Sequence, residues 1–522
     1  MQPDLWQPPV ELSETERAII KRIRRAKLFV FLRRNRHVIF DEALQGEMAA
    51  TYSENAEGQP PIAPAQLGLA VLLQAYTGVS DDEVIEACQM DRRWQLVLDC
   101  LECEHAPFSK GTFVAFRERL IAHQLDRRLV EQTVKIAAQN GGFGSRQLRG
   151  ALDSSPLWGA GRVEDTYNLL GHALRKALGV IARQQGRELT VVAEEAGASL
   201  VAGLSLKAAL DLDWDDPQEQ AQALGVVLTA LDAVEQWLTR QPIEVQGEPP
   251  VQNSLAAAHQ IEAQDVVTTA QGTLALRQGV APDRRISIED EEMRHGRKSK
   301  SQLIDGYKRH ILRDLDSGLV RAVGITAANQ PEASVTDAIA ADLAAQGVTL
   351  CELHIDRAYL SSTLVKARPP ELVIYCKAWP VQPSDCFTKE AFTLDWERGL
   401  MRCPNGVDMP FIPGETVHFP VKQCQACPLR AQCTRSQRGR TVSVHEEEAL
   451  LAELRQRQLT AEGRAKLRER VDVEHALAHI GYWQGWRARY RGSRKNLFDL
   501  RRCAVINNLH EVARQPAFAN AA

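Results

Sequence analysis

Apolar residues recur at helical spacing through the first part of the chain. Residues 13–16 (Ser-Glu-Thr-Glu) match the capping box of a helix start, and residues 80–83 (Ser-Asp-Asp-Glu) repeat that pattern. Between them, residues 67–76 are apolar enough to form a buried helix. We therefore expect a helical N-terminal domain over 1–145, built either as a DNA-binding helix-turn-helix module or as a plain helical bundle.

The hydrophobic period changes after this domain. Residues 147–152 read as a short strand that ends in Asp153, and Ser-Ser-Pro at 154–156 reads as a turn. Residues 166–280 are rich in Ala, Leu and Gln and again predict helices. Strand patterns return at 304–312, 319–326, 348–355 and 372–376, with a helical segment at 333–346.

This order of elements predicts a mixed α/β core that is interrupted by insertions. Beyond it, a segment rich in Pro, Gly and Cys is followed by helices that run almost to the end of the chain. The expected division is a helical N-terminal domain (1–145), the first core strand (146–165), a helical insertion (166–280), the rest of the core (281–380), a cysteine-rich lobe (381–445) and C-terminal helices (446–522).

Composition narrows the class of protein only a little. The chain has 522 residues, with 63 Lys+Arg against 67 Asp+Glu, so the net charge of −4 neither favours nor excludes nucleic acid. It lacks both an apolar run of about 18 residues or more and a secretory leader, which predicts a soluble cytoplasmic protein. The 11 cysteines are an odd number at low density, so reduced thiols or a metal site are expected rather than disulfides.

Two aspartates follow predicted strands. Asp153 comes after Leu-Arg-Gly-Ala-Leu, and Asp356 comes after Leu-His-Ile. A carboxylate at the end of a central strand is rigidly held and suits a hard cation such as Mg²⁺. A single such aspartate is more often a turn or cap residue, and two improve the case without deciding it.

An acidic residue also lies in the C-terminal helical region. Arg470 and Glu474 are four residues apart and share one helix face. By themselves they predict no more than an exposed ion pair.

Basic residues are clustered rather than scattered, which favours binding of a polyanion over a solvated basic face. The last cluster is interleaved with Trp483, Trp486 and Tyr490, and aromatic stacking beside cations is typical of nucleic-acid contact. The clusters are residues 17–36, residues 294–300 with Arg297 and Lys298, and a C-terminal run of Arg487, Arg489, Arg491, Arg494, Lys495, Arg501 and Arg502.

Four cysteines in the predicted lobe have metal-ligand spacing. Cys424 and Cys427 form a Cys-x2-Cys pair, and Cys403 and Cys433 lie in the same loop-rich segment. Four thiolates fit a structural, tetrahedral Zn²⁺ site, and unlinked reduced thiols are the alternative.

Together these motifs resemble, over residues 25–515, the DDE transposases of bacterial insertion sequences. Asp153-Ser-Ser is similar to the segment of the first catalytic Asp, His354-Ile-Asp356 to that of the second, and Arg470-x3-Glu474 to the final helix. The cysteine pattern resembles a lobe found in one branch of the family. The chain departs from some relatives, which carry a Tyr and a Lys where it has Leu467 and Gly481.

The resemblance implies an α/β RNase H-like core and a transposase that cuts DNA at the ends of its element and joins them to target DNA. Asp153, Asp356 and Glu474 would hold two Mg²⁺ or Mn²⁺ ions. The implied partners are double-stranded DNA, as terminal inverted repeats and target, and a second copy of the chain, with the protein on the nucleoid when bound. A nuclease or resolvase that does not join DNA, and an inactive DNA-binding regulator, remain alternatives. The expected DNA contacts are Arg470, Arg487, Arg489, Arg491, Lys495, Arg297 and Lys298.

Overall fold

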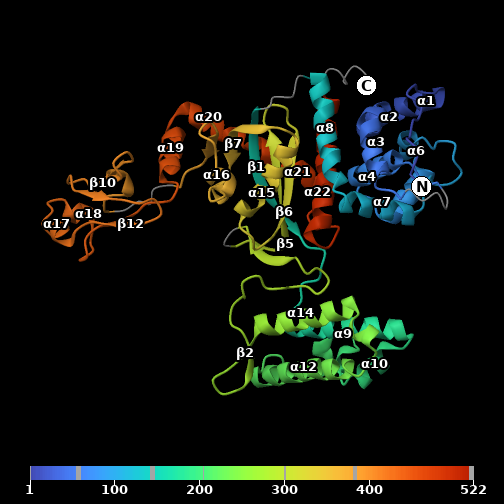
Figure 1. The fold of residues 1–522 in the computed structure, drawn as a ribbon, viewed down its shortest axis with the longest axis horizontal. Helices are drawn as coiled ribbons and strands as arrows, with labels where there is room; N and C mark the ends of the chain where they lie inside the picture. Colours follow the sequence, from blue (N-terminus) through green and yellow to red (C-terminus); the bar gives the residue numbers. More distant parts are fainter. Residues whose placement is uncertain are drawn as a thin grey trace.

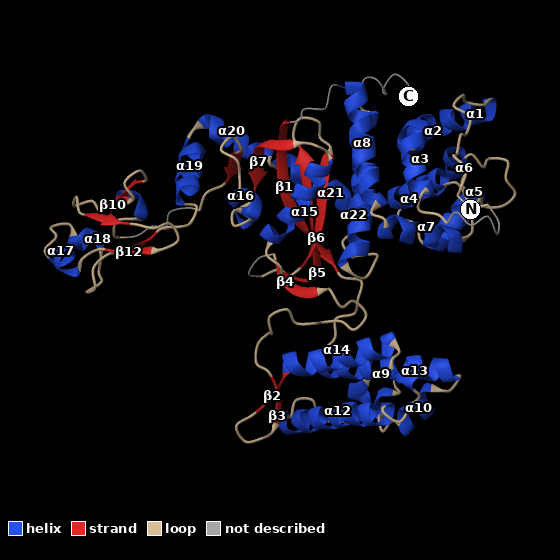
Figure 2. Cartoon of the chain, viewed as in Figure 1, coloured by secondary structure: helices blue, strands red, loops and turns tan. Residues whose placement is uncertain are grey.

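The computed structural model describes residues 2–53, 60–141, 147–203, 205–298, 301–379 and 385–515. A central sheet with its covering helices lies in the middle, and three other parts extend from it (Figure 1). They are the N-terminal helices, a helical insertion and a cysteine-rich lobe. Helices make up most of the N-terminal part and the insertion, whereas the longest strands lie in the central sheet (Figure 2).

The N-terminal segment is helical, as its hydrophobic pattern predicts. Ser13 and Glu16 form a complete capping box at the first helix, and Ser80 and Glu83 form another at the fifth. Ser109 caps the seventh helix by accepting a hydrogen bond from the backbone N–H of Thr112. The helices are α1 (Glu14–Arg22), α2 (Lys27–Ile39), α3 (Glu42–Ala49), α4 (Pro64–Thr77), α5 (Asp81–Met90), α6 (Arg92–Leu98), α7 (Lys110–Ala122) and α8 (Leu125–Gly141).

The central sheet is mixed and has the strand order β4-β5-β1-β7-β8, with β6 paired to β5. The pairs β1–β5 and β5–β6 are antiparallel, whereas β7 runs parallel to β1 and β8 parallel to β7. The four strand segments expected from the sequence after residue 300 all form strands of this sheet. The strands are β1 (Gln147–Trp158), β4 (Arg294–Arg297), β5 (Leu303–Asp314), β6 (Val320–Ala327), β7 (Thr349–Ile355) and β8 (Val373–Cys376).

The first strand is longer than its sequence predicts. The expected turn at 154–156 is wrong, because β1 continues to Trp158 while it pairs with β5 along its whole second half. On its other side β1 pairs with β7, which ends at Ile355 opposite Leu152, so β7 pairs with no residue of β1 after Leu152. Pro156 lies in that later part of β1, where the N–H that a proline lacks is not needed to pair with β7.

Helices cover both faces of the sheet. Leu148 and Leu152 point to the face covered by α15 (Thr336–Ala345), and Ala151 points to the face covered by α21 (Val471–Gln484). Because side chains alternate along a strand, Asp153 shares the α21 face with Ala151. Short helical turns connect the last strands: η2 (Glu332–Val335), η3 (Arg357–Tyr359) and α16 (Thr363–Lys366).

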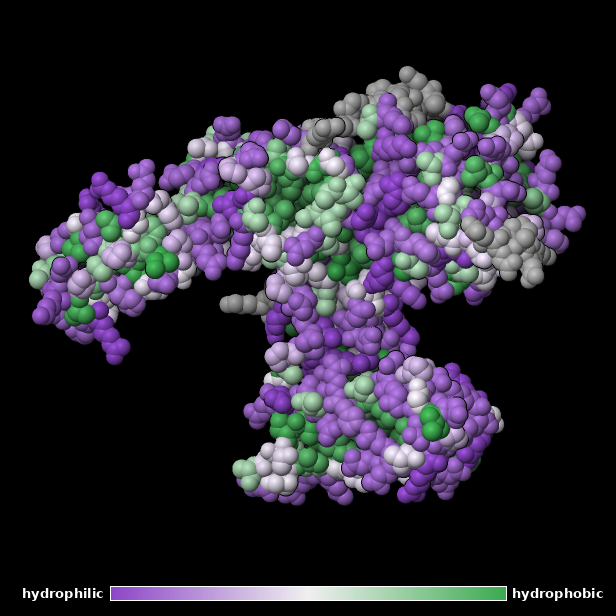
Figure 3. Space-filling model, in the orientation of Figure 1, coloured by the Kyte–Doolittle hydropathy of each residue, from purple (hydrophilic) through white to green (hydrophobic). Residues whose placement is uncertain are grey.

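The helical insertion has a hydrophobic core of its own, made of residues within 167–261 plus Ile288. Its last part was expected to be helical, but residues 266–276 form a small hairpin instead. Hydrophilic side chains cover most of the insertion and its connection to the sheet in the view of Figure 3. The elements are α9 (Thr166–Gln185), α10 (Leu189–Glu195), η1 (Ser199–Val201), α11 (Leu206–Leu210), α12 (Pro217–Leu238), α13 (Ile243–Gln246), α14 (Pro249–Asp265), β2 (Val266–Thr268) and β3 (Leu274–Leu276).

The segment rich in Pro, Gly and Cys folds into short strands and turns around a small apolar cluster. The sequence predicted a loop-rich segment, yet it contains a three-stranded and a two-stranded sheet. Its elements are η4 (Lys389–Ala391), β9 (Thr393–Asp395), β10 (Leu400–Arg402), β11 (Asp408–Pro410), β12 (Thr416–His418), α17 (Val421–Gln425), α18 (Arg430–Cys433) and β13 (Thr441–Ser443).

The chain ends in helices, as predicted, and the last one joins two cores. Val505 and Leu509 of α22 are buried among the N-terminal helices, and Leu500 and Ala504 pack with β1, β5 and β6. No helix in the described parts of the chain is both long and apolar enough to cross a membrane. The C-terminal helices are α19 (Glu448–Leu459), α20 (Ala461–Glu469), α21 and α22 (Ser493–Ala513).

Candidate active site

Asp153 and Asp356 lie at the same level on neighbouring strands. Leu152 of β1 is in register with Ile355 of β7, so the residues that follow both are aspartates. Asp356 is exposed, comes directly after β7 and accepts a hydrogen bond from the backbone N–H of Ala358 at 3.1 Å. Asp153 lies within β1 rather than at its end, and its side chain is only 14% exposed.

Glu474 reaches the same place from the first turn of α21. Arg470, at the junction of α20 and α21, donates from Nη1 to Asp153 Oδ2 at 2.6 Å and from Nη2 to Glu474 Oε1 at 2.6 Å. One guanidinium therefore lies between two carboxylates that are 321 residues apart in the chain. The pair Arg470–Glu474 is more than the simple exposed ion pair that its spacing suggests.

The pKa of Asp153 reflects its burial and the charges around it, including those of the other two acids. Burial raises the pKa of the Asp153 carboxyl, and the negative charges of Glu474 and Asp356 raise it further. Arg470 and the N–H of Ser154, which donates to Oδ1 at 2.8 Å, act in the opposite direction without cancelling the rise. A site that concentrates carboxylate charge in this way attracts cations.

A second charged cluster, which no sequence motif indicated, lies on the same face a few residues back along the strands. Among the residues that the structure describes, Glu352, His354 and Glu469 are the group whose potential metal-ligand atoms all lie within 4.8 Å of one another. Arg149 Nε contacts Glu352 at 2.9 Å, Lys466 Nζ contacts it at 3.0 Å, and Arg149 also pairs with Glu469.

These cations already balance the acids, so we interpret the cluster as an ion-pair network between β1, β7 and α20. Burial alone would raise the pKa of the Glu352 carboxyl, but hydrogen bonds from Arg149, Lys466 and His354 outweigh it and lower the pKa to about 2. The sequence did carry a signal for this cluster. Glu352, His354 and Asp356 occupy every second position, and such residues share a face of a strand.

The C-terminal basic run is largely engaged with other parts of the protein. Arg487 donates to the carbonyl oxygens of Gly159 and Ala160 at 3.1 and 3.3 Å. Arg489 donates to the carbonyls of Gly78 and Val79 at 2.6 and 2.7 Å, and Arg491 pairs with Glu289. The other arginines of the run pair as follows: Arg494 with Asp126, Arg501 with Asp126 and Asp342, and Arg502 with Asp499.

The other basic residues singled out in the sequence differ in exposure, and some are exposed whereas others are buried. Lys495 on α22, and Arg297 and Lys298 at the end of β4, are exposed. In the cluster at 17–36, Arg33 and Arg36 are buried and pair with Glu16 and Asp99. DNA contact by the residues named from the sequence thus stays a prediction.

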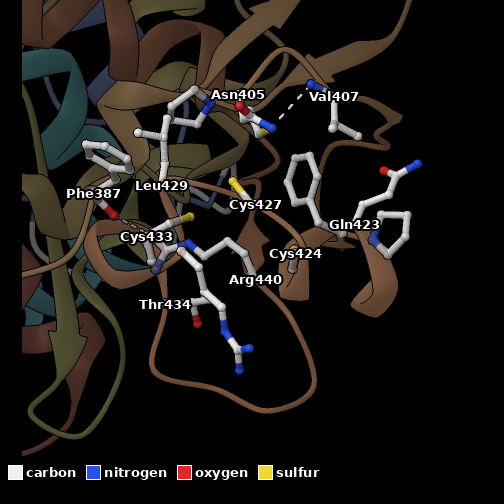
Figure 4. A pocket seen from close by; sticks show the side chains of 15 residues that line it. Phe387, Asn405, Val407, Gln423, Cys424, Cys427, Leu429, Cys433, Thr434 and Arg440 are labelled. Carbon is white, nitrogen blue, oxygen red and sulfur yellow. Dashed lines mark hydrogen bonds between the residues drawn. The ribbon is translucent and has the colours of Figure 1, made fainter.

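The four cysteines of the lobe surround one small cavity, which Phe387 and Phe419 also line. Figure 4 shows Cys424, Cys427 and Cys433 around it. Burial raises the pKa of the Cys433 thiol, and the other three thiols add to the rise although Arg440 opposes it. The backbone N–H of Val407 points at Cys403 Sγ, at 3.4 Å. The fold thus gathers the cysteines that the sequence singled out.

Two parts of the chain match known families. Residues 402–513, which include Glu474 and the four cysteines, match the family described as a transposase DDE domain. Residues 18–119 match the family described as a transposase domain (DUF772). No curated protein and no solved structure matches the chain. The two family matches, one in the N-terminal helices and one around Glu474, indicate a DDE transposase of an insertion-sequence element.

Proposed function

We propose that the protein cuts DNA at the ends of its element and joins those ends to target DNA, with Asp153, Asp356 and Glu474 as its catalytic carboxylates. The observation that carries this proposal is the convergence of the three acids at one edge of the sheet. Asp153 is held by a central strand, Asp356 by the turn after the neighbouring strand, and Glu474 by a helix that packs on β1 and β5.

The strand order supports an RNase H-like core. Three successive antiparallel strands (β1, β5, β6) are followed by two strands that run parallel to β1, in the spatial order β6-β5-β1-β7-β8. The helical insertion follows β1, and the cysteine-rich lobe lies between β8 and the helix of Glu474. Neither insertion therefore interrupts the edge of the sheet at which the three acids lie.

Divalent cations fit the donor set, because all three groups offer the carboxylate oxygens that Mg²⁺ and Mn²⁺ prefer. Arg470 already supplies a positive charge between Asp153 and Glu474, which is where a cation is favoured. A pair of such ions would activate the attacking hydroxyl and stabilise the leaving oxygen. The residues that would hold them are Asp153, Asp356 and Glu474.

The proposed reaction consists of two in-line displacements at phosphorus. In the first, a water oxygen attacks the phosphodiester at the element's end, and the 3′-oxygen leaves and takes up a proton. In the second, that 3′-hydroxyl loses its proton and attacks a phosphodiester of target DNA, whose own 3′-oxygen leaves. Two element ends must be joined to one target, so we infer a homodimer on double-stranded DNA that carries terminal inverted repeats.

We also propose that Cys403, Cys424, Cys427 and Cys433 hold a structural Zn²⁺ ion. Four thiolates leave no position open for a substrate, so the ion would only stabilise the lobe. The N–H of Val407 directed at Cys403 supports this proposal, because such a donor favours a thiolate over a thiol.

A cleavage and joining assay tests the main proposal. Purified protein is incubated with Mg²⁺ and a plasmid that carries two element ends, and the products are separated on a gel. We expect nicked or linear donor DNA and joined product from the wild type, and neither from Asp153→Asn, Asp356→Asn or Glu474→Gln. Asp472→Asn, an exposed acid in the same turn as Glu474, is the matched control and should keep activity.

Each other outcome has a definite meaning. A triad variant that still cuts removes that residue from the mechanism. Cutting without joining makes the protein a nuclease or resolvase, and DNA binding without cutting makes it a regulator.

A further inference from the structure

An open cavity of about 430 Å³ lies beside Asp356. Asp356 is the one acidic residue in its lining, whereas five basic residues line it. We call it the basic cavity. Its basic residues are Arg357, Lys377, Arg464, Arg468 and Arg470.

Three separate segments bring these cations together. β7 and β8 are parallel neighbours, so Arg357 and Lys377, which follow them, lie at the same edge of the sheet. Arg464 and Arg468 come from α20. In the sequence these residues are spread over positions 357 to 470, and Glu462 and Glu469 flank those of α20.

Most of this charge is not balanced by the protein. Arg357, Lys377 and Arg468 form no ion pair with any residue in the described parts of the chain. Arg464 donates to two backbone carbonyls, the nearer being that of Leu459 at 2.7 Å. The cavity therefore differs from the C-terminal run, whose arginines largely pair with acids, and its unpaired cations create a local positive potential.

Aromatic groups accompany the cations. Tyr375 lines the basic cavity, and the Arg357 guanidinium lies 6.0 Å from the ring centroid of Trp379, which is 44% exposed. Cations that follow a backbone together with exposed aromatic rings are the usual features of a site for a nucleic-acid strand.

We propose that the basic cavity binds the phosphodiester backbone of the DNA strand that is cut, next to the scissile phosphate. The proposal rests on the proposed function, because it takes Asp356 as the point where that phosphate lies. A strand that reaches Asp356 must continue past it, and the cavity offers the neighbouring phosphates unpaired cations within the same lining. The C-terminal basic run would then serve mainly to hold the protein together.

The salt dependence of DNA binding tests this assignment. The double variant Lys377→Gln/Arg468→Gln and the wild type are titrated, in a chelator so that nothing is cut, with a fluorescent duplex that carries the element's end. Binding is followed by anisotropy over a range of KCl concentrations. Each lost phosphate contact lowers the slope of log K against log salt by about 0.7 to 0.9, so we expect a loss of about 1.5.

Two matched controls separate this effect from a general change in charge. Lys377→Arg/Arg468→Lys keeps both charges and should keep the slope. Arg183→Gln/Arg240→Gln removes two exposed charges from the helical insertion and should change the slope less than the cavity variant. Melting temperatures show whether all variants are folded.

An unchanged slope in Lys377→Gln/Arg468→Gln, or an equal loss in the Arg183→Gln/Arg240→Gln control, would overturn the assignment. The cleavage assay distinguishes this failure from failure of the proposed function. If cutting requires Asp153 and Glu474 but the slope does not move, only the basic cavity is misassigned. If Asp153→Asn cuts as well as the wild type, the proposed function itself is wrong.

Discussion

Arg470 is the basic residue that pairs with two of the three acids of the candidate site. It balances Asp153 and Glu474 at once, and a divalent cation that binds both acids must compete with it. The guanidinium is 27% exposed, so this competition is partly screened by solvent.

Arg470→Gln should therefore tighten binding of Mn²⁺ in the absence of DNA. We expect a gain on the order of tenfold, ~1.4 kcal/mol, because the competing positive charge is removed. Calorimetry or the electron paramagnetic resonance signal of free Mn²⁺ measures it. Arg468→Gln removes the same charge two residues away without a contact to Asp153 or Glu474, and should change the affinity less. Weaker binding by Arg470→Gln would mean that the arginine assists the metal site.

At the level of elements, the network of Arg149, Glu352, Lys466 and Glu469 fastens α20 to β1 and β7. α21 begins directly after α20, so the network also sets the position of Glu474. Because the pKa of the Glu352 carboxyl is lowered, the stability that this ion-pair network contributes depends on pH.

Glu352→Gln should lower the free energy of unfolding most above pH 4.5, the ordinary pKa of the carboxyl. The folded protein keeps Glu352 ionised down to about pH 2, so its contribution is complete above pH 4.5 and is lost as the pH falls towards 2. The expected cost is on the order of 3 kcal/mol at neutral pH. Urea titrations from pH 3 to 7 measure it, with Glu371→Gln, an exposed acid before β8, as the control. A cost that does not vary with pH would rule out the ionic explanation.

The cysteine-rich lobe is a second element whose stability we expect to depend on one interaction. Cys424→Ser should abolish binding of about one equivalent of zinc and lower the melting temperature, because the small apolar cluster alone stabilises the lobe weakly. Metal analysis and calorimetry measure both effects. Cys386 lies in the same lobe outside the cavity lining, so Cys386→Ser should retain the zinc. Equal zinc content in the two variants would refute the site.

Features that neighbouring residues determine could be predicted from the sequence, whereas features that depend on contacts between distant segments could not. The capping residues Ser13 and Ser80 act within one turn, so their pattern was sufficient to locate helix starts. The turn expected after Asp153 was wrong because the end of β7, which lies 199 residues after Pro156, decides whether Pro156 can stay in a strand. Glu474 was named through the family resemblance, but its link to Asp153 through Arg470 depends on packing between distant segments.

On the scale of the whole molecule, the helical insertion and the N-terminal helices differ in how far each forms its hydrophobic core from its own residues. The insertion packs on itself, and the buried residues of its core lie within 167–261 apart from Ile288. The core of the N-terminal helices, in contrast, includes five residues of α22, namely Phe498, Val505, Ile506, Leu509 and Val512.

A fragment of residues 162–290 should therefore fold alone and melt cooperatively, whereas a fragment of residues 2–141 should not. Without α22 the N-terminal helices expose the apolar surface that those five side chains cover. Circular dichroism and calorimetry of the two fragments measure this. Cooperative melting of residues 2–141 at the temperature of the full chain would contradict the shared core.

The position of α22 also has a consequence for the timing of protein synthesis. Asp153 and Asp356 leave the ribosome long before Glu474, and α22, the helix that completes the N-terminal core, follows Glu474. A growing or prematurely ended chain thus has neither its third carboxylate nor a finished core. We expect such a chain to be prone to proteolysis and unable to cut DNA, so the proposed activity should arise only in chains translated past α22.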